Sequence, residues 1–144
     1  MKTLFLIVCA CFVTGTGISQ HYYKDLVLTG DLAKKRALYQ ANRVKSVRIH
    51  SFDNMDQPIE GFNCNQSVAN NFSEIRTLTK DPLTGASEST SFFDAKGQLV
   101  RSIDTSEGNK NVVTYGYNEA GKLTIVTSST TSPGQFNSRE QHYW

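Results

Sequence analysis

A seven-residue pattern that occurs twice constrains this 144-residue chain more than any other feature. It consists of an aromatic residue, Asp or Asn, two variable residues, Gly, a polar residue and Leu. The first copy runs from Phe93 to Leu99, and the second runs from Tyr117 to Leu123, 24 residues later. A weaker copy runs from Phe52 to Ile59, with Asp56 where the other two have Gly. A period of this length indicates a repeat architecture.

The spacing of the pattern fits a β-hairpin with a three-residue loop. In the second copy the loop is 119–121, a type I turn followed by a residue in the left-handed conformation. Gly121 suits that position because it has no Cβ, and the Asn118 side chain can bond the backbone of its own turn. Gly97 and Asp94 take the same roles in the first copy. The pattern therefore encodes the register of each hairpin.

That register predicts which side chains lie opposite each other. The expected pairs are Tyr117 with Leu123, Tyr115 with Ile125, Val113 with Thr127, Phe93 with Leu99, Phe92 with Val100, Phe52 with Pro58, and His50 with Glu60. Asp56 is compatible with the left-handed conformation, and Pro58 indicates an edge or a strand start. The first hairpin would carry apolar residues on both faces. We therefore expect the N-terminal helix or the strand at 44–49 to cover its second face.

Most of the remaining chain alternates between apolar and polar residues in short segments. Strands are expected near 44–49 and over 72–79, 86–93, 98–104, 111–117, 123–129 and 136–143, separated by turn clusters at 81–85, 107–109 and 132–134. This spacing predicts a mainly all-β fold, an antiparallel β-meander of hairpins. No turn follows the last segment, which is either a terminal edge strand or the beginning of another unit. We expect a longer array, because repeat units need neighbours to bury their faces.

The first 19 residues resemble a secretory signal peptide. Lys2 supplies the positive start, and the apolar run 4–13 has the length of a signal core and is too short to span a bilayer. Gly17 and Ser19 fit a cleavage site before Gln20. Cleavage rather than lipid attachment at Cys11 or Cys9 is expected. The predicted location is therefore secreted, periplasmic or on the cell surface, with no transmembrane span in the mature chain.

A short helix is expected in the segment 20–43. Good helix formers fill 31–41, Asp31 can cap the start, and Asn42 can end it. The buried face is expected to carry Leu28, Leu32 and Tyr39, and the basic run 34–36 is expected to be solvated. The predicted organisation is a signal peptide (1–19), a helical segment (20–43) and a hairpin repeat region (44–144) that is incomplete at its end.

The hairpin pattern resembles the YD, or RHS-like, repeat of secreted bacterial proteins, whose function is uncharacterised. The resemblance is close over 86–129 and loose over 44–62, and 20–43 lies outside it. The residues that carry it are Phe93, Asp94, Gly97, Leu99, Tyr115, Tyr117, Asn118, Gly121 and Leu123. It implies exported β surfaces that wrap, shield or bind other molecules, and it implies no catalytic residue. Two good copies are too few for a closed shell.

The chain offers few groups in the arrangements that chemistry requires. The three His residues, His21, His50 and His142, lack metal-ligand spacing, and nucleotide-binding and hydrolase motifs are absent from the sequence. A net charge of +2 gives no field typical of a nucleic-acid partner. In the mature chain Cys64 would be the single cysteine, either a buried small side chain or a free or intermolecular thiol.

These observations predict no cofactor, no metal and no enzymatic activity. The favoured function is a secreted or cell-envelope structural or interaction module. The alternative is a module that binds an extracellular glycan or protein, with Tyr22-Tyr23 and Tyr143-Trp144 as stacking aromatics. A small exported hydrolase is the least favoured. A row of exposed aromatics on one sheet face would support glycan binding, and a concave pocket with convergent titratable groups would support an enzyme.

Overall fold

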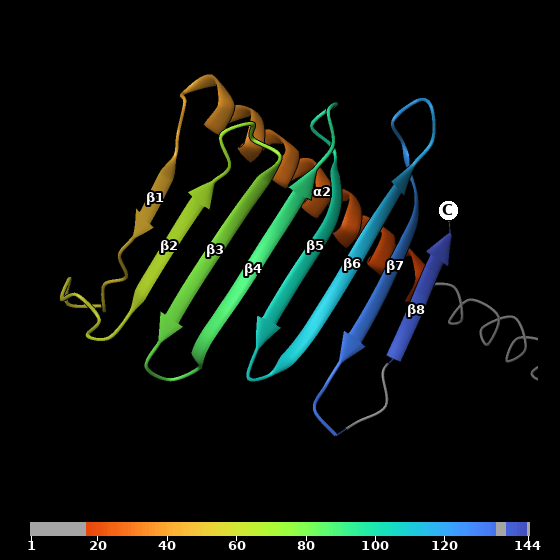
Figure 1. The fold of residues 1–144 in the computed structure, drawn as a ribbon. Helices are drawn as coiled ribbons and strands as arrows, with labels where there is room; N and C mark the ends of the chain where they lie inside the picture. Colours follow the sequence, from red (N-terminus) through yellow and green to blue (C-terminus); the bar gives the residue numbers. More distant parts are fainter. Residues whose placement is uncertain (1–16, 135–137, 144) are drawn as a thin grey trace, which may run out of the picture.

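The computed structural model describes residues 17–134 and 138–143 and shows one open antiparallel sheet with a helix across one face (Figure 1). The eight strands lie in the sheet in chain order, each paired with the next. The elements are α2 (Gly17–Ala41), β1 (Ser46–Ile49), β2 (Asn63–Val68), β3 (Glu74–Asp81), β4 (Gly85–Phe93), β5 (Leu99–Ser106), β6 (Asn109–Tyr117), β7 (Leu123–Thr131) and β8 (Ser138–Tyr143). The predicted mainly β meander is confirmed. Cys9 and Cys11 lie outside the described residues. The expected signal peptide (1–19) also lies outside them, except for residues 17–19.

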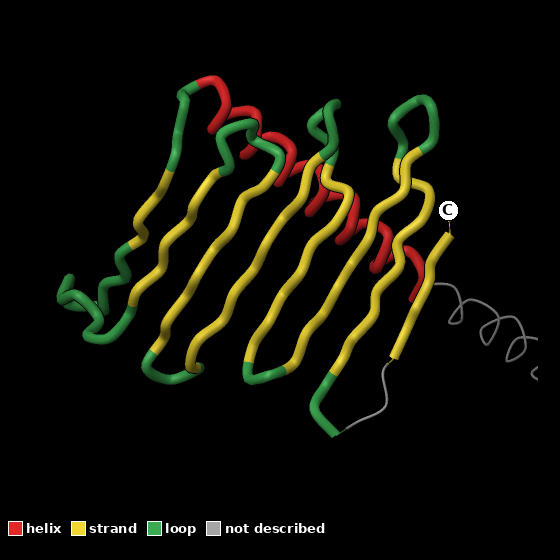
Figure 2. Tube along the Cα trace, in the orientation of Figure 1, coloured by secondary structure: helices red, strands yellow, loops and turns green. Residues whose placement is uncertain are grey.

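Seven of the strands were expected from the sequence, and β2 was missed. Its sequence, NCNQSV, is rich in residues that strands generally avoid. Burial nevertheless alternates along it, because Cys64, Gln66 and Val68 all face the helix. Position within the sheet outweighs strand propensity here. The three predicted turn clusters at 81–85, 107–109 and 132–134 do connect strands, as Figure 2 shows for the loops at the sheet edges.

The helix is longer than its composition suggested, because it begins at Gly17 rather than at Asp31. Asp31, which was expected to cap the start, lies inside it together with the preceding Thr29 and Gly30. The Thr29 hydroxyl donates to the carbonyl of Asp25 at 2.9 Å, so this side chain is satisfied within the helix. The C-terminal end was placed correctly. The residue there with a left-handed backbone is Arg43 (φ 52°), whose N–H donates to the carbonyl of Gln40 at 3.2 Å.

The face of α2 that meets the sheet differs from the expected one. Leu32 and Tyr39 do pack on the core, but Leu28 is 40% exposed and is not among the side chains packed against it. Arg36, expected to be solvated, instead donates from Nε to the carbonyl of Phe72 at 2.8 Å, and its guanidinium lies over the ring of Phe93. A long side chain can cover apolar surface with its stem while its head finds a polar partner.

The core lies between α2 and the middle of the sheet. Its buried members are Val68, Ile75, Phe93, Leu99, Tyr115, Leu123 and Val126. Leu99 is fully buried, and each repeat turn places its Leu in this core. Burying an aliphatic side chain of this size contributes about 1.5–3 kcal/mol. The repeat pattern therefore serves both the turn and the helix–sheet interface.

The predicted register holds at the turns and then shifts by one residue. Phe93 pairs with Leu99 and Tyr117 with Leu123, as expected, but a bulge follows each pair. The observed partners are Tyr115 with Val126, Val113 with Ser128, and Phe92 with Arg101, which replace Ile125, Thr127 and Val100. Val100 and Thr124 are the extra residues. A bulge re-aims the strand beyond it, so Leu123 and Val126 both face the core although they are three residues apart.

The expectation that both sheet faces are covered is wrong for the described residues. The strand expected near 44–49 becomes β1 and joins the sheet instead of covering it. The helix covers only the face that carries Phe93 and Tyr115. Directly paired residues share a face and neighbours along a strand alternate, so Phe92, Ile103 and Val112 lie on the opposite face. No described element covers that face, which we call the open face.

Candidate functional site

The two repeat turns have the same hydrogen bonds. In the first, the Asp94 N–H donates to the carbonyl of Gln98 at 3.0 Å, and the N–H of Gln98 donates back to Asp94 Oδ1 at 2.9 Å. Asn118 exchanges the same two bonds with Lys122 at 3.0 and 2.9 Å. The glycines three residues after Asp94 and Asn118 have φ of 84° and 76°. The Asp or Asn side chain thus acts as a bracket that closes the three-residue loop.

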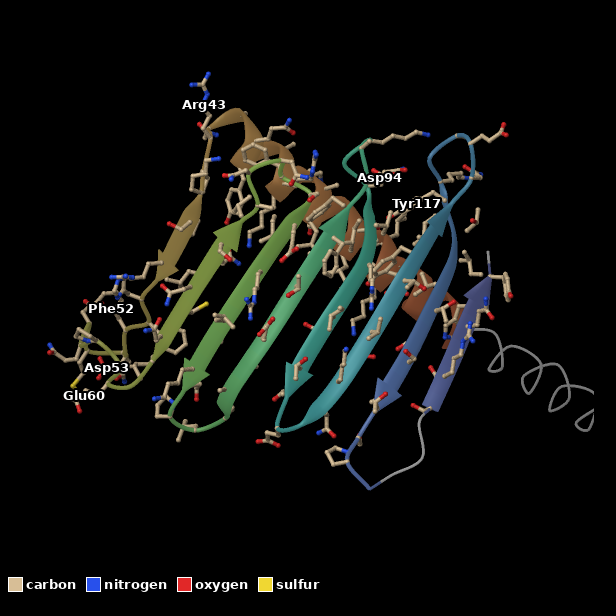
Figure 3. All side chains as sticks on the ribbon, viewed as in Figure 1. Arg43, Phe52, Asp53, Glu60, Asp94 and Tyr117 are labelled. Atoms are coloured by element: carbon tan, nitrogen blue, oxygen red, sulfur yellow. The ribbon has the colours of Figure 1, made fainter. Side chains whose placement is uncertain are left out.

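The weak third copy forms the same turn, at the opposite end of the strands from the two good copies. Asp53 makes the equivalent bonds with Gln57, and Asp56 is left-handed at φ 59°. Phe52 pairs with Pro58 as predicted, but the bridge is isolated and the expected pair of His50 and Glu60 does not form. In Figure 3, Phe52 and Asp53 lie at the lower edge, whereas Asp94 and Tyr117 lie at the upper edge.

The turn in phase with the two good copies joins β2 to β3, and the sequence pattern missed it. The Ala69 N–H donates to the carbonyl of Glu74 at 3.0 Å, and Phe72 is left-handed at φ 57°. The loop is one residue longer and has an aromatic residue where the others have Gly, which hid it. Counting 24 residues back from Asp94 leads to Asn70, so the period itself would have located this turn.

The repeat turns contact one another and α2, and these contacts stabilise the end of the sheet that carries the turns. The Gln98 amide donates to the carbonyl of Gly121 at 3.2 Å, which joins the first repeat turn to the second. Arg36 joins the helix to the turn at Phe72 and lies against Gly97. The Tyr117 hydroxyl donates to the carbonyl of Leu99 at 2.8 Å. The repeat residues that the sequence singled out therefore take part in the contacts of the turns and the core.

The hydroxyls of two repeat tyrosines have raised pKa values, because Tyr115 is buried and Tyr117 is partly buried. Burial raises the pKa of Tyr115 to about 12 and also raises the pKa of Tyr117. Both effects favour the neutral phenol. Neither tyrosine is available as a base near neutral pH, which agrees with a structural role for the motif.

The centre of the open face is a described surface that could receive a partner. A shallow depression of about 410 Å³ lies there, over strands β3 to β6. Its floor contains Phe92 and Ile103, and its rim contains Arg76, Glu88 and Lys110, together with Glu74, Thr90 and Thr105. Leu78 stands nearby with 45% of its surface exposed. The site combines a small apolar floor with a charged rim.

One strong ion pair crosses this rim. The Arg76 guanidinium donates two hydrogen bonds to the Glu88 carboxylate, from Nε and from a terminal nitrogen, each at 2.7 Å. This hydrogen bonding lowers the pKa of Glu88 and raises that of Arg76. Glu88 is therefore ionised at neutral pH and is not poised as a proton donor.

Cys64 lies on the opposite face of the sheet from this depression. Cys64 is buried on β2, where its sulfur accepts a hydrogen bond from the Thr79 hydroxyl at 3.5 Å. Among the described residues, no cluster of three or more His, Cys, Asp or Glu side chains could hold a metal ion. In the same part of the chain, no helix has both the length and the apolar character needed to cross a membrane.

The comparison with known families matches the hairpins described above. Residues 93–133 match the family described as RHS Repeat. The matched segment contains β5, β6 and β7 and all nine residues of the motif. No curated protein and no solved structure shows a significant match. Residues 93–133 are therefore similar to an RHS repeat, in agreement with the resemblance that the two turn motifs carry.

Proposed function

We propose that this protein is a secreted or cell-envelope interaction module without catalytic activity, and that it binds a partner protein through the open face. The observation that carries the proposal is the uncovered apolar centre formed by Phe92, Ile103 and Val112. In the described part of the molecule, α2 covers one face of the sheet. On the other face these three side chains are half-buried and in contact with solvent. The RHS repeat supports a structural or interaction role.

A glycan partner is less well supported by the side chains present. Sugar-binding surfaces need exposed rings on which sugars stack. Phe93 and Tyr115 are buried, and the guanidinium of Arg101 lies 5.8 Å from the centre of the Phe92 ring. Tyr23 and Tyr143 are about 70% exposed, but they lie on the helix and on β8 and do not form a row.

A hydrolase, the least favoured function, is considered because the depression gathers Glu74, Glu88 and Lys110. The bidentate bond to Arg76 opposes this function, since it keeps Glu88 ionised and occupied. Loss of a measurable hydrolytic activity in Glu88→Gln, in a folded variant, would establish the enzyme and overturn the proposal.

The proposal is tested by photo-crosslinking in the cells that produce the protein. A photoreactive phenylalanine derivative replaces Thr105 or Thr114, both exposed on the open face, and replaces Lys34 on α2 as the control. We expect one specific adduct with a protein from both open-face positions and none from Lys34. Adducts from Lys34 alone would place the interaction elsewhere.

A further inference from the structure

Charge is distributed unevenly between the two faces of the sheet. The strand register places six basic side chains on the open face and only two acidic ones, Glu74 and Glu88. The basic residues are Arg48, Arg76, Lys80, Arg101, Lys110 and Arg139, and all six are exposed. The whole chain carries only +2. The open face is therefore strongly basic on a protein that is nearly neutral, a feature that composition alone hides.

The basic groups extend across almost the whole sheet. They come from β1, β3, β5, β6 and β8, and neighbouring strands lie about 4.8 Å apart. The five strand spacings from Arg76 to Arg139 span about 24 Å on this basis. A single small anion cannot contact groups so widely spaced. The ligand that matches them is extended and carries several negative charges.

Most of this charge is not neutralised within the described residues. Arg76 is paired with Glu88, and Arg101 lies over Phe92, but none of the other four basic side chains has an ion pair in the described part. Such a field attracts an oppositely charged partner and speeds its association.

We propose that the open face binds an acidic amphipathic segment of a partner protein. This inference rests on the proposed function and specifies the chemistry of the partner. Carboxylates of the segment would pair with Arg101, Lys110 and Arg139, while its apolar side chains would cover Phe92 and Ile103. An acidic polysaccharide would satisfy the charges but would not cover the apolar floor, and the described open face lacks a row of exposed rings for sugars to stack on.

The test uses fluorescence anisotropy with the secreted protein and defined probes. The first probe is a labelled amphipathic peptide of Glu and Leu, and its counterpart has Lys in place of Glu. Polygalacturonate and duplex DNA serve as competitors. The variant is Arg101→Glu with Lys110→Glu, and the matched control is Lys96→Glu with Lys122→Glu, which makes the same charge change in the two repeat turns. Circular dichroism checks that both variants are folded.

We expect the Glu/Leu peptide to bind and the Lys/Leu peptide not to bind. The open-face variant should lose about tenfold or more in affinity, the control should lose about twofold or less, and salt should weaken binding because these charges are solvated. Equal losses in both variants would overturn the inference, as would stronger binding of polygalacturonate or DNA at the same residues. Open-face crosslinks that persist in the charge-reversed variant would refute the acidic partner while leaving the proposed function intact.

Discussion

Gly97 and Gly121 occupy equivalent positions in the two repeat turns. Comparing their alanine substitutions therefore separates the cost of the turn conformation from the cost of the contacts around each turn. Both have positive φ, at 84° and 76°. An L-residue in this conformation loses about 1–2 kcal/mol, and alanine regains about 0.4–1 kcal/mol through the unfolded chain. A Cβ at Gly121 would lie 3.1 Å from the Gln98 amide, which can shift. We therefore expect Gly121→Ala to lower the free energy of unfolding by about 1 kcal/mol.

Gly97→Ala should be considerably more damaging because of Arg36. A Cβ there would lie 2.7 Å from a terminal nitrogen of the Arg36 guanidinium, too close without movement. That guanidinium is held by the bond to the Phe72 carbonyl, and a hydrogen bond to a charged group is worth about 1.5–3 kcal/mol. If half or more of the stabilisation from this bond is lost, Gly97→Ala lowers the free energy of unfolding by about 2–3 kcal/mol in total.

Urea unfolding followed by circular dichroism measures both changes. A double-mutant cycle with Arg36→Ala isolates the contact, because without the guanidinium Gly97→Ala should fall to the value of Gly121→Ala. Equal effects of the two glycine substitutions in the wild-type background would refute the reasoning. So would additivity of Gly97→Ala and Arg36→Ala, since it would show that the two residues do not interact.

Three further predictions address the helix end, the turn bracket and the core. Arg43→Gly should raise the free energy of unfolding by about 0.5–1 kcal/mol, because Gly is favoured at the left-handed residue that ends a helix; a loss of stability in thermal unfolding would contradict this. Asp94→Ala and Asn118→Ala should each remove about 1 kcal/mol, since a buried or turn amide loses its acceptor; urea midpoints unchanged from wild type would count against the bracket. Burial raises the pKa of Tyr115 to about 12, above its ordinary value of 10.0, so the stabilising neutral form is fully present below pH 10. Its contribution, up to roughly 2 kcal/mol, is then lost as pH rises toward 12, and Tyr115→Phe should flatten that loss in urea titrations between pH 9 and 12.

Local turn chemistry could be predicted from the sequence because it depends on a few adjacent residues. The positions of Asp94, Gly97, Asn118 and Gly121 fix the loop length, and the loop length fixes the first pair across each hairpin. The open meander followed from repetition of that unit. These features need no knowledge of distant contacts.

Features that depend on the whole sheet were harder to predict. The bulges at Val100 and Thr124 reverse the alternation of faces, and nothing within one strand signals them. Arg36 looked solvated because its partner, the carbonyl of Phe72, lies 36 residues away. The polar strand β2 forms because its neighbours supply the ladder and α2 supplies the cover.

The basic open face could not be read from the sequence for the same reason. Its six charges are scattered from Arg48 to Arg139, and their common side is defined only once every strand has its register. Net charge indicated no strong field and so argued against a charged partner surface. The inference of an acidic partner rests on how charge is divided between the two faces of the sheet and not on the total charge.

The most direct test of the account is whether the open face is in fact open in the protein in solution. Val113 and Thr114 are neighbours on β6 with opposite orientations, Val113 packed toward α2 and Thr114 exposed on the open face. Each is replaced by Cys in a background in which Cys9, Cys11 and Cys64 are all Ser, and the rate of reaction with a maleimide is measured. We expect Thr114→Cys to react at the rate of a free thiol and Val113→Cys to react at least about tenfold more slowly, because reaction there requires local opening. Equal rates, or protection of Thr114→Cys in the isolated protein, would contradict the central claim.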